Sequence, residues 1–169
     1  LRNMGLCYRR LENYEEALET YKLLVTETPD DLKIESLIGY CNLKLENYET
    51  ALQQYFKIEY KDPKYSNVIR PIAWCYFAQG ELDKSEKYFM KVLDANPDYY
   101  DYINYGHVKW AMGDRKSAIE NYILSTNYSN FTLSDLNKIM EDDMSLLLKN
   151  GIDKDEIPLM MDYLRYSQK

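Results

Sequence analysis

Residues recur at an interval of 34 along most of this 169-residue chain, and this internal repeat constrains its fold more than any other feature. The pentapeptide LENYE at residues 11–15 returns unchanged at residues 45–49. The interval is also marked by Gly5 and Gly39, Ala17 and Ala51, Tyr21 and Tyr55, and by Pro29, Pro63 and Pro97. A third copy carries Ala73, Ser85 and Phe89 in the matching slots, and a fourth, at an interval of 33, carries Gly106, Ala118 and Tyr122.

Each copy divides into two stretches whose apolar residues fall three or four apart, the period of an amphipathic helix. A polar turn separates the two stretches, and proline ends the second one because it lacks an N–H and disfavours a helical residue before it. Three glycines, Gly5, Gly39 and Gly106, fall inside expected helices, where glycine costs ~1 kcal/mol against alanine. We therefore expect close helix contact at these three positions, whereas Gly80 and Gly113 are expected in turns.

These residues resemble the tetratricopeptide repeat, a helix-turn-helix unit with a Leu-Gly-x-x-Tyr patch, then alanine, an aromatic residue and a closing proline. The match to the first copy is Met4-Gly5-x-x-Tyr8, Ala17, Tyr21 and Pro29. The resemblance implies an all-α fold, a right-handed α-solenoid (superhelix) of four repeats over residues 1–130. The departures are Asn42 and Lys109 at the patch tyrosine, Glu35 at the slot of the first large apolar residue, and Pro71 near the start of a helix.

Residues 131–169 fall outside the repeat, and we expect them to form C-terminal capping helices that cover the exposed face of the last repeat. Thr132 followed by Asp135 predicts a capping box at the start of an amphipathic helix that ends near Gly151. A shorter helix is expected at residues 156–166. The chain begins with Leu1 rather than Met, and its first copy lacks three opening residues, so we treat it as a segment of a longer array.

Composition narrows the class of function. The formal charge is -7, which argues against nonspecific nucleic-acid binding, because that depends on Lys and Arg contacts with phosphates. No stretch approaches the ~20 apolar residues that a membrane span needs. The sequence as given shows no signal peptide, but it begins with Leu1, so removal of a targeting segment stays open and the compartment is not assigned; the unpaired thiols favour a reducing compartment such as the cytoplasm.

Catalytic and cofactor-binding patterns are missing from the sequence. A single histidine, His107, would have to support any Ser-His or Cys-His chemistry, and no Gly-rich phosphate loop or zinc motif occurs. Cys7, Cys41 and Cys75 share one repeat slot, and equivalent slots on stacked helices lie too far apart for a disulfide. We interpret the cysteines as small apolar residues, and we expect no enzyme activity, no metal and no cofactor.

The resemblance implies a concave groove lined by the first helix of every repeat, which in this family binds peptides. The implied groove residues are Arg2, Leu6, Arg9, Ser36, Tyr40, Leu43, Arg70, Trp74, Phe77, Ile103, His107 and Trp110. This set is basic in the first repeats and aromatic in the last ones. It contains no acid, although 28 of 169 residues are acidic and about two would be expected among twelve. Arginine and aromatic side chains are the residues that binding hot spots favour.

We therefore predict a noncatalytic protein-protein interaction module that binds a peptide segment with acidic and apolar residues, and neither nucleic acid nor a membrane. Two alternatives stay open. The chain is a structural or self-associating solenoid segment, such as a homo-oligomer, whose groove is filled by its own C-terminal helices or by a neighbouring copy. Alternatively, it is the regulatory part of a longer enzyme or sensor.

Overall fold

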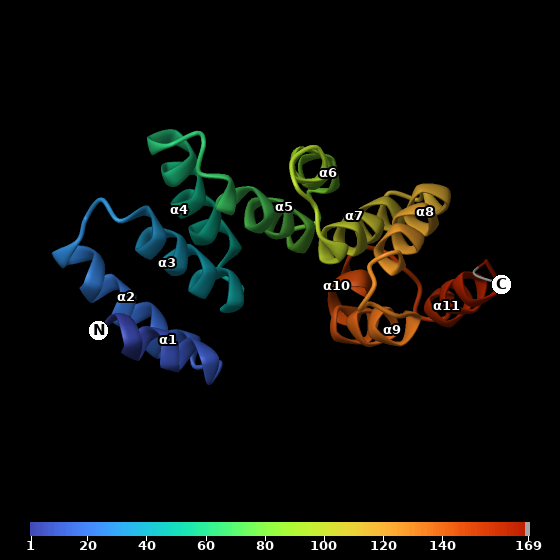
Figure 1. Ribbon diagram of the computed structural model, residues 1–169, viewed down its shortest axis with the longest axis horizontal. Coiled ribbons are helices and arrows are strands. Elements are labelled where there is room, and N and C mark those ends of the chain that lie inside the picture. The colour runs from blue at the N-terminus through green and yellow to red at the C-terminus, as the bar shows by residue number, and fades with distance from the viewer. Residues whose placement is uncertain (168–169) are drawn as a thin grey trace. The chain divides into compact units, whose positions relative to one another are not determined.

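The structure, a computed structural model, describes residues 1–167, and these residues form helices and connecting turns (Figure 1). In chain order the helices are α1 (Arg2–Arg10), α2 (Tyr14–Glu27), α3 (Leu32–Lys44), α4 (Tyr48–Lys61), the 3₁₀ helix η1 (Ser66–Val68), α5 (Ile69–Ala78), α6 (Leu82–Leu93), α7 (Tyr99–Ala111), α8 (Arg115–Thr126), α9 (Leu133–Asp142), α10 (Met144–Lys149) and α11 (Glu156–Ser167). The pairs α1/α2, α3/α4, α5/α6 and α7/α8 coincide with the four copies of the repeat. The last two residues of the expected capping region, 168–169, lie outside the described residues.

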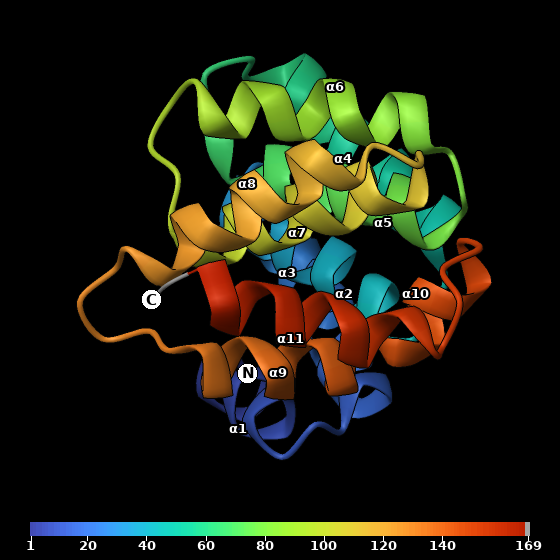
Figure 2. The same cartoon turned by 90° about the vertical axis from the view of Figure 1, so that its right-hand side faces the viewer.

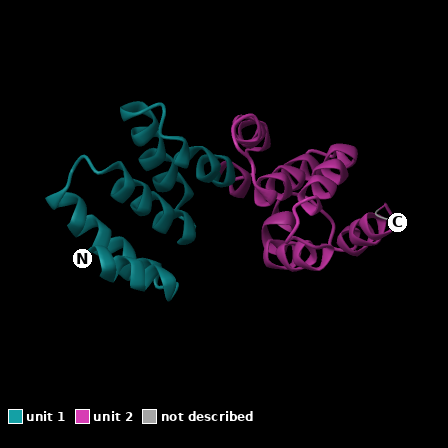
Figure 3. Ribbon diagram, viewed as in Figure 1, with its two compact units in different colours: residues 1–75 teal, residues 76–169 magenta. Residues whose placement is uncertain are grey.

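The chain divides into two compact units, residues 1–75 and residues 76–169 (Figure 3). Unit 1 contains α1 to α4, η1 and most of α5. Unit 2 contains α6 to α11. The boundary between the units falls inside α5, at the first helix of the third copy, and the division into repeats and cap at residue 130 stays a prediction.

In unit 1 each of the helices α1 to α3 packs against the next one along the chain. The core joins α2 to α3 through one buried cluster, Ala17, Leu18, Tyr21, Leu24, Ile34, Ile38 and Cys41. The members of the cluster on α2 recur every three or four residues, so they share one side of the helix. The spacing of the apolar residues thus positions the repeat helices, as the sequence predicted.

The three helical glycines are confirmed as points of close helix contact. A Cβ added at Gly5, Gly39 or Gly106 would stand 2.5 to 2.6 Å from the ring of the tyrosine in the second helix of the same repeat. These tyrosines are Tyr21, Tyr55 and Tyr122. Only a residue without a side chain fits there, which offsets the poor helix propensity of glycine.

The turn inside each repeat requires one residue in the left-handed region. Gly80 and Gly113 supply it with φ of 78° and 83°, as expected for glycines in turns. In the first two copies the same slot is occupied by Glu12 and Glu46, which adopt φ of 57° and 60°. A side chain is strained in this region, so the turn of the first two repeats forms at a conformational cost that the last two avoid.

The C-terminal region differs from the prediction in one respect. The capping box at Thr132 and Asp135 is present, but the expected single helix is broken at Asp143 into α9 and α10. The cap therefore consists of three helices, and α11 lies between α8 and α9 (Figure 2). Near Pro71 the expected irregularity takes the form of η1, whose 3₁₀ turn precedes α5.

Candidate protein-interaction surface

The predicted groove residues of unit 2 are buried, so the expectation that they line an open groove needs correction. Phe77, Ile103 and His107 are 0% exposed and Trp110 is 4% exposed. They cannot contact a partner in this structure. The sequence alternative in which the chain's own C-terminal helices fill this surface agrees with the structure of unit 2.

Polar contacts fasten the cap to the third and fourth repeats. The Lys149 Nζ donates to the carbonyl of Ala78 at 2.7 Å, and the Asn150 Nδ2 donates to the carbonyl of Phe77 at 3.1 Å. These two carbonyls lie at the end of α5, where a helix leaves its last acceptors without donors of its own, and the Phe77 carbonyl also accepts from the Gly80 N–H at 2.9 Å. The segment around α10 therefore serves as a side-chain cap for α5.

His107 lies at the centre of the covered surface. Its Nδ1 is 2.8 Å from the hydroxyl of Tyr122, and its Nε2 is 3.5 Å from an Asp143 carboxylate oxygen, which is long for a hydrogen bond. Burial, and then the Asp143 charge, raise the pKa of Tyr122 well above its usual value, so its hydroxyl keeps its proton. The imidazole joins α7 to α8 and to the cap, which is a structural arrangement.

Trp110 of α7 and the side chains of α11 line one cavity. This cavity of about 250 Å³ is lined by Trp110, Arg115, Ile119, Glu156, Leu159, Met160 and Tyr163. Arg115 of α8 and Glu156 of α11 form an ion pair at this cavity. The cap is thus tied to the fourth repeat through Asp143 and through Glu156, the first residue of α11.

In unit 1 the predicted groove residue Arg2 already has an acidic partner. Its guanidinium donates to an Asp31 carboxylate oxygen at 2.9 Å. Burial raises the pKa of Asp31, but hydrogen bonds from Arg2 and from the backbone N–H groups of Ile34 and Lys33 outweigh it and lower this pKa. Arg2 therefore joins α1 to the beginning of α3.

Arg9 and Lys44, in contrast, contact aromatic rings rather than acids. The Arg9 guanidinium carbon lies 5.4 Å from the centre of the Tyr40 ring, and the Lys44 Nζ lies 5.9 Å from the same ring and 6.0 Å from that of Tyr14. The two tyrosine rings meet edge to face at 6.1 Å. No ion pair joins Arg9 or Lys44 to an acid among residues 1–167. We call Arg9, Tyr14, Tyr40 and Lys44 the cationic-aromatic cluster.

The cluster combines two positive charges with the neutral hydroxyl of Tyr14. Burial, and then the neighbouring Tyr40, raise the pKa of Tyr14 to about 12. Arg9, Tyr14 and Tyr40 are half-buried and Lys44 is exposed, so the cluster is open to solvent. Arg9 and Tyr40 were predicted groove residues. Tyr14 was missed, although its place in the repeated pentapeptide was a signal, because Tyr48 is its equivalent in the second copy.

The other predicted groove residues stay predictions. Leu6, Ser36 and Leu43 are half-buried in unit 1. Arg70 is exposed and Trp74 is half-buried at the end of unit 1, and both take part in interactions.

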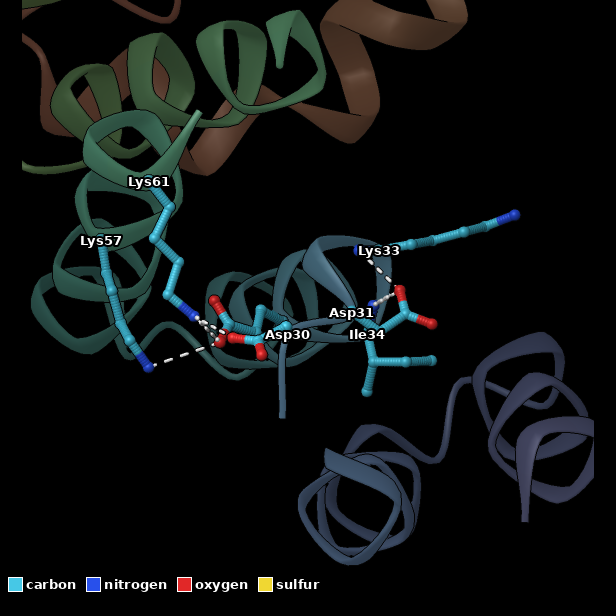
Figure 4. A network of polar contacts seen from close by, with 7 residues as sticks. Asp30, Asp31, Lys33, Ile34, Lys57 and Lys61 are labelled. Atoms are coloured by element: carbon cyan, nitrogen blue, oxygen red, sulfur yellow. Dashed lines mark hydrogen bonds and ion pairs between the residues drawn. The ribbon is translucent and has the colours of Figure 1, made fainter. Parts of the chain in front are cut away.

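A second polar cluster in unit 1 surrounds the buried Glu35. Glu35 occupies the slot of a large apolar residue and is 2% exposed. Its Oε1 accepts hydrogen bonds from Lys61 Nζ at 2.8 Å and Lys57 Nζ at 3.4 Å, whereas its Oε2 is buried without a hydrogen-bond partner. Figure 4 shows both lysines reaching from α4 towards the beginning of α3, where Asp30 also lies. These contacts join α3 to α4.

The described residues offer little for catalysis. Among residues 1–167 no three His, Cys, Asp or Glu side chains come together to hold a metal ion. Burial raises the pKa of Cys41 to about 11 and that of Cys75 to about 12, so both thiols keep their protons and are poor nucleophiles. No helix among these residues is both long and apolar enough to cross a membrane.

Comparisons with known proteins agree with this architecture. The family model for the tetratricopeptide repeat matches residues 3–31 and 72–99. A search of curated proteins finds no match. Solved structures with a similar fold include MamA, residues 41 to the end, from Desulfovibrio magneticus RS-1, which is 19% identical with a TM-score of 0.67 over 74% of this chain and 71% of that one.

Two further structures are described as tetratricopeptide repeat proteins. The one from Parabacteroides merdae is 22% identical, with a TM-score of 0.70 over 96% of this chain and 69% of that one. The one from Thermus thermophilus is 22% identical, with a TM-score of 0.69 over 85% of this chain and 78% of that one. Together with the repeat register, these findings define an all-α repeat solenoid, a class that serves as a scaffold for protein contacts. Two segments of the chain thus match the tetratricopeptide repeat, and its fold is that of tetratricopeptide repeat proteins.

Proposed function

We propose that the chain is a noncatalytic interaction module that binds an acidic segment of a partner protein at the cationic-aromatic cluster of unit 1. The observation that carries the proposal is the pairing of Arg9 and Lys44 with aromatic rings alone, in a chain whose formal charge is -7. An acidic chain has many carboxylates available to neutralise these cations, yet none of those described does so.

Burial in the two units supports a site in unit 1. The corresponding surface of unit 2 is occupied by the chain's own cap, whereas Tyr40 and Leu43 keep part of their surface in contact with solvent. A carboxylate of the partner would pair with Arg9 and Lys44, while an apolar neighbour in the partner would cover the exposed parts of the two rings. Aromatic rings bury large area with few rotors, and arginine forms paired hydrogen bonds with carboxylates.

The proposal implies binding that depends on salt. Charges that meet at a partly exposed surface attract less as ionic strength rises, because counterions screen them over ~10 Å at 0.1 M. The partner is therefore expected to associate faster at low salt, and loss of either cation is expected to slow association.

Fluorescence anisotropy with two labelled peptides tests the proposal. One peptide alternates Glu and Asp with Phe and Leu, and the other carries Gln and Asn in place of the acids. The acidic peptide is expected to bind more tightly, and the double substitution Arg9→Gln, Lys44→Gln is expected to weaken it by about tenfold, as loss of paired charge at a hot spot does.

A matched control removes the same charge elsewhere. Arg10→Gln with Lys22→Gln changes two exposed cations, and Lys22 already pairs with Glu19 at 2.8 Å. This control is expected to keep the affinity within about twofold, since screened surface charges contribute little. Equal weakening by both double variants would show a general charge effect and would contradict a site at the cluster.

A further inference from the structure

A cavity of about 290 Å³ lies between the beginning of α7 and the side of α9, both in unit 2. We call it the α7/α9 cavity. Its walls combine three aromatic rings with charged side chains: Tyr99, Tyr100 and Phe131 with Asp135, Lys138 and Asp142. A cavity of roughly 150 Å³ accepts a benzene molecule, so the space here suffices for one long side chain of a partner.

The three rings form a stack with one accessible end. The Tyr99 ring contacts both others: its centre lies 4.5 Å from that of Phe131, with 26° between the planes, and 4.4 Å from that of Tyr100, with 33° between the planes. Phe131 is 8% exposed, whereas Tyr100 is 48% exposed. The Tyr100 ring therefore ends the stack with much of its surface in solvent, where a further planar group can stack on it.

The carboxylates of the cavity have capacity for a donor. Asp142 is exposed, and its side chain forms neither a hydrogen bond nor an ion pair among residues 1–167. The Asp135 carboxylate accepts two hydrogen bonds from Thr132, both at Oδ2. Lys138 also lines the cavity, but among the same residues it forms no ion pair with either acid.

The electrostatic environment of the ring stack is negative. A hydrogen bond with Tyr100, and then burial, raise the pKa of the Tyr99 hydroxyl. The charges of Asp98 and Asp135 raise this pKa further, because they disfavour a second negative charge nearby. A negative potential at the rings favours a cationic ligand over an acidic one.

Arginine is the side chain that meets both conditions. Its planar guanidinium stacks on an aromatic ring while its N–H groups donate to carboxylates, whereas the lysine ammonium offers a charge without a plane. We propose that the α7/α9 cavity is a docking site for an arginine in a basic segment of a partner protein, whose guanidinium stacks on Tyr100 and pairs with Asp142. This site is independent of the cationic-aromatic cluster, which is proposed to bind acids.

An NMR titration of the whole chain with three short peptides tests the proposal. The peptides have the sequence Gly-Ser-X-Ser-Gly with blocked ends, and X is arginine, lysine or citrulline. Citrulline keeps the plane of arginine but is neutral. Shifts of the Tyr100 ring signals are followed up to about 10 mM peptide, which covers millimolar dissociation constants. The arginine peptide is expected to bind at least about threefold more tightly than either other peptide, as a cation over a ring does.

Variants of the cavity separate the contribution of the ring from that of the charges. Tyr100→Leu is expected to weaken binding of the arginine peptide about threefold, and Tyr100→Phe is expected to keep it, because the ring remains. Asp142→Asn should weaken binding about twofold to threefold, and Lys138→Gln should strengthen it by a similar factor. Asp155→Asn removes the same charge from an exposed acid outside the cavity and is expected to change the affinity little.

Several results would overturn the proposal. These are equal binding of the three peptides, no shift at 10 mM peptide, or undiminished binding to a Tyr100→Leu chain that keeps its helical circular dichroism. Equal weakening by Asp142→Asn and Asp155→Asn would show a general charge effect instead. Sedimentation from about 5 to 200 μM tests a competing occupant. A dimer that Tyr100→Leu dissociates would identify an arginine of a second copy as the occupant and would overturn a separate partner.

Discussion

Replacing Gly106 by alanine probes how tightly the two helices of the fourth repeat meet. A Cβ at this position would stand 2.6 Å from Cε1 and 2.9 Å from Cδ1 of the Tyr122 ring. The ring is 0% exposed, and its hydroxyl is held 2.8 Å from His107 Nδ1. The ring therefore cannot withdraw from the new methyl group without giving up this hydrogen bond or moving a helix.

The expected cost follows from three contributions. Overfilling a packed contact costs about 1–3 kcal/mol, and loss of the buried hydrogen bond costs about 1 kcal/mol more. The higher helix propensity of alanine offsets about 1 kcal/mol. We expect the Gly106→Ala variant to be less stable than the original chain by about 1–3 kcal/mol.

Urea unfolding followed by far-UV circular dichroism measures this difference. With a denaturant slope of about 2 kcal/mol/M, the midpoint is expected to fall by about 0.5–1.5 M. In the third copy the glycine slot holds Ala73 and the aromatic slot holds Phe89, so the repeat sequence combines a methyl group with a ring that lacks a hydroxyl. Gly106→Ala should therefore cost less in a Tyr122→Phe background. A Gly106→Ala chain as stable as the original would refute the argument, since the steric contact and the lost hydrogen bond would then cost no more than the helix propensity of alanine returns.

Three further predictions concern stability. Glu46→Gly relieves a left-handed residue at φ 60° and is expected to add about 0.5–1 kcal/mol, seen as a higher urea midpoint; a lower midpoint would contradict strain at this turn. Glu35→Leu replaces a buried carboxylate that has one unpartnered oxygen, so the free energy of unfolding should stay equal or rise by about 1–2 kcal/mol. A clearly lower free energy of unfolding would show that the ion pairs of Glu35 outweigh the cost of its desolvation. Backbone and side-chain hydrogen bonds from Ser117, and then Lys109, lower the pKa of Asp114 to about 2. The contribution of Asp114 to the free energy of unfolding is therefore present above about pH 4 and is lost as the pH falls towards 2. In the Asp114→Asn variant the urea midpoint should depend less on pH in this range.

Much of the fold could be predicted because the same residue types recur at the same positions of several repeats. Gly5 and Gly39 share a slot with Gly106, and each meets a tyrosine of its own repeat. The turn residues follow the same logic: Gly80 and Gly113 reveal the left-handed slot, which then predicts the unusual φ of Glu12. Local periodicity and turn chemistry depend on neighbouring residues alone, so they can be inferred without knowing the rest of the chain.

The position of the cap could not be predicted in this way. The sequence shows an amphipathic stretch after Thr132, but nothing local says which face it covers. That choice depends on contacts across long sequence separations, such as those from Asn150 to Phe77 and from Asp143 to His107. The aromatic residues of the fourth repeat therefore looked like an open binding surface, when they are a core that the cap completes.

The packing order within each unit bears on how the chain unfolds. In unit 1 contacts join consecutive helices, so α1 has a helix neighbour on one side and can separate from α2 without disturbing α3. In unit 2 α11 returns to contact α8 and α9, which closes a long loop and couples distant segments. Amide hydrogen exchange should therefore begin by fraying at α1, whereas α7 and α8 should exchange together and late.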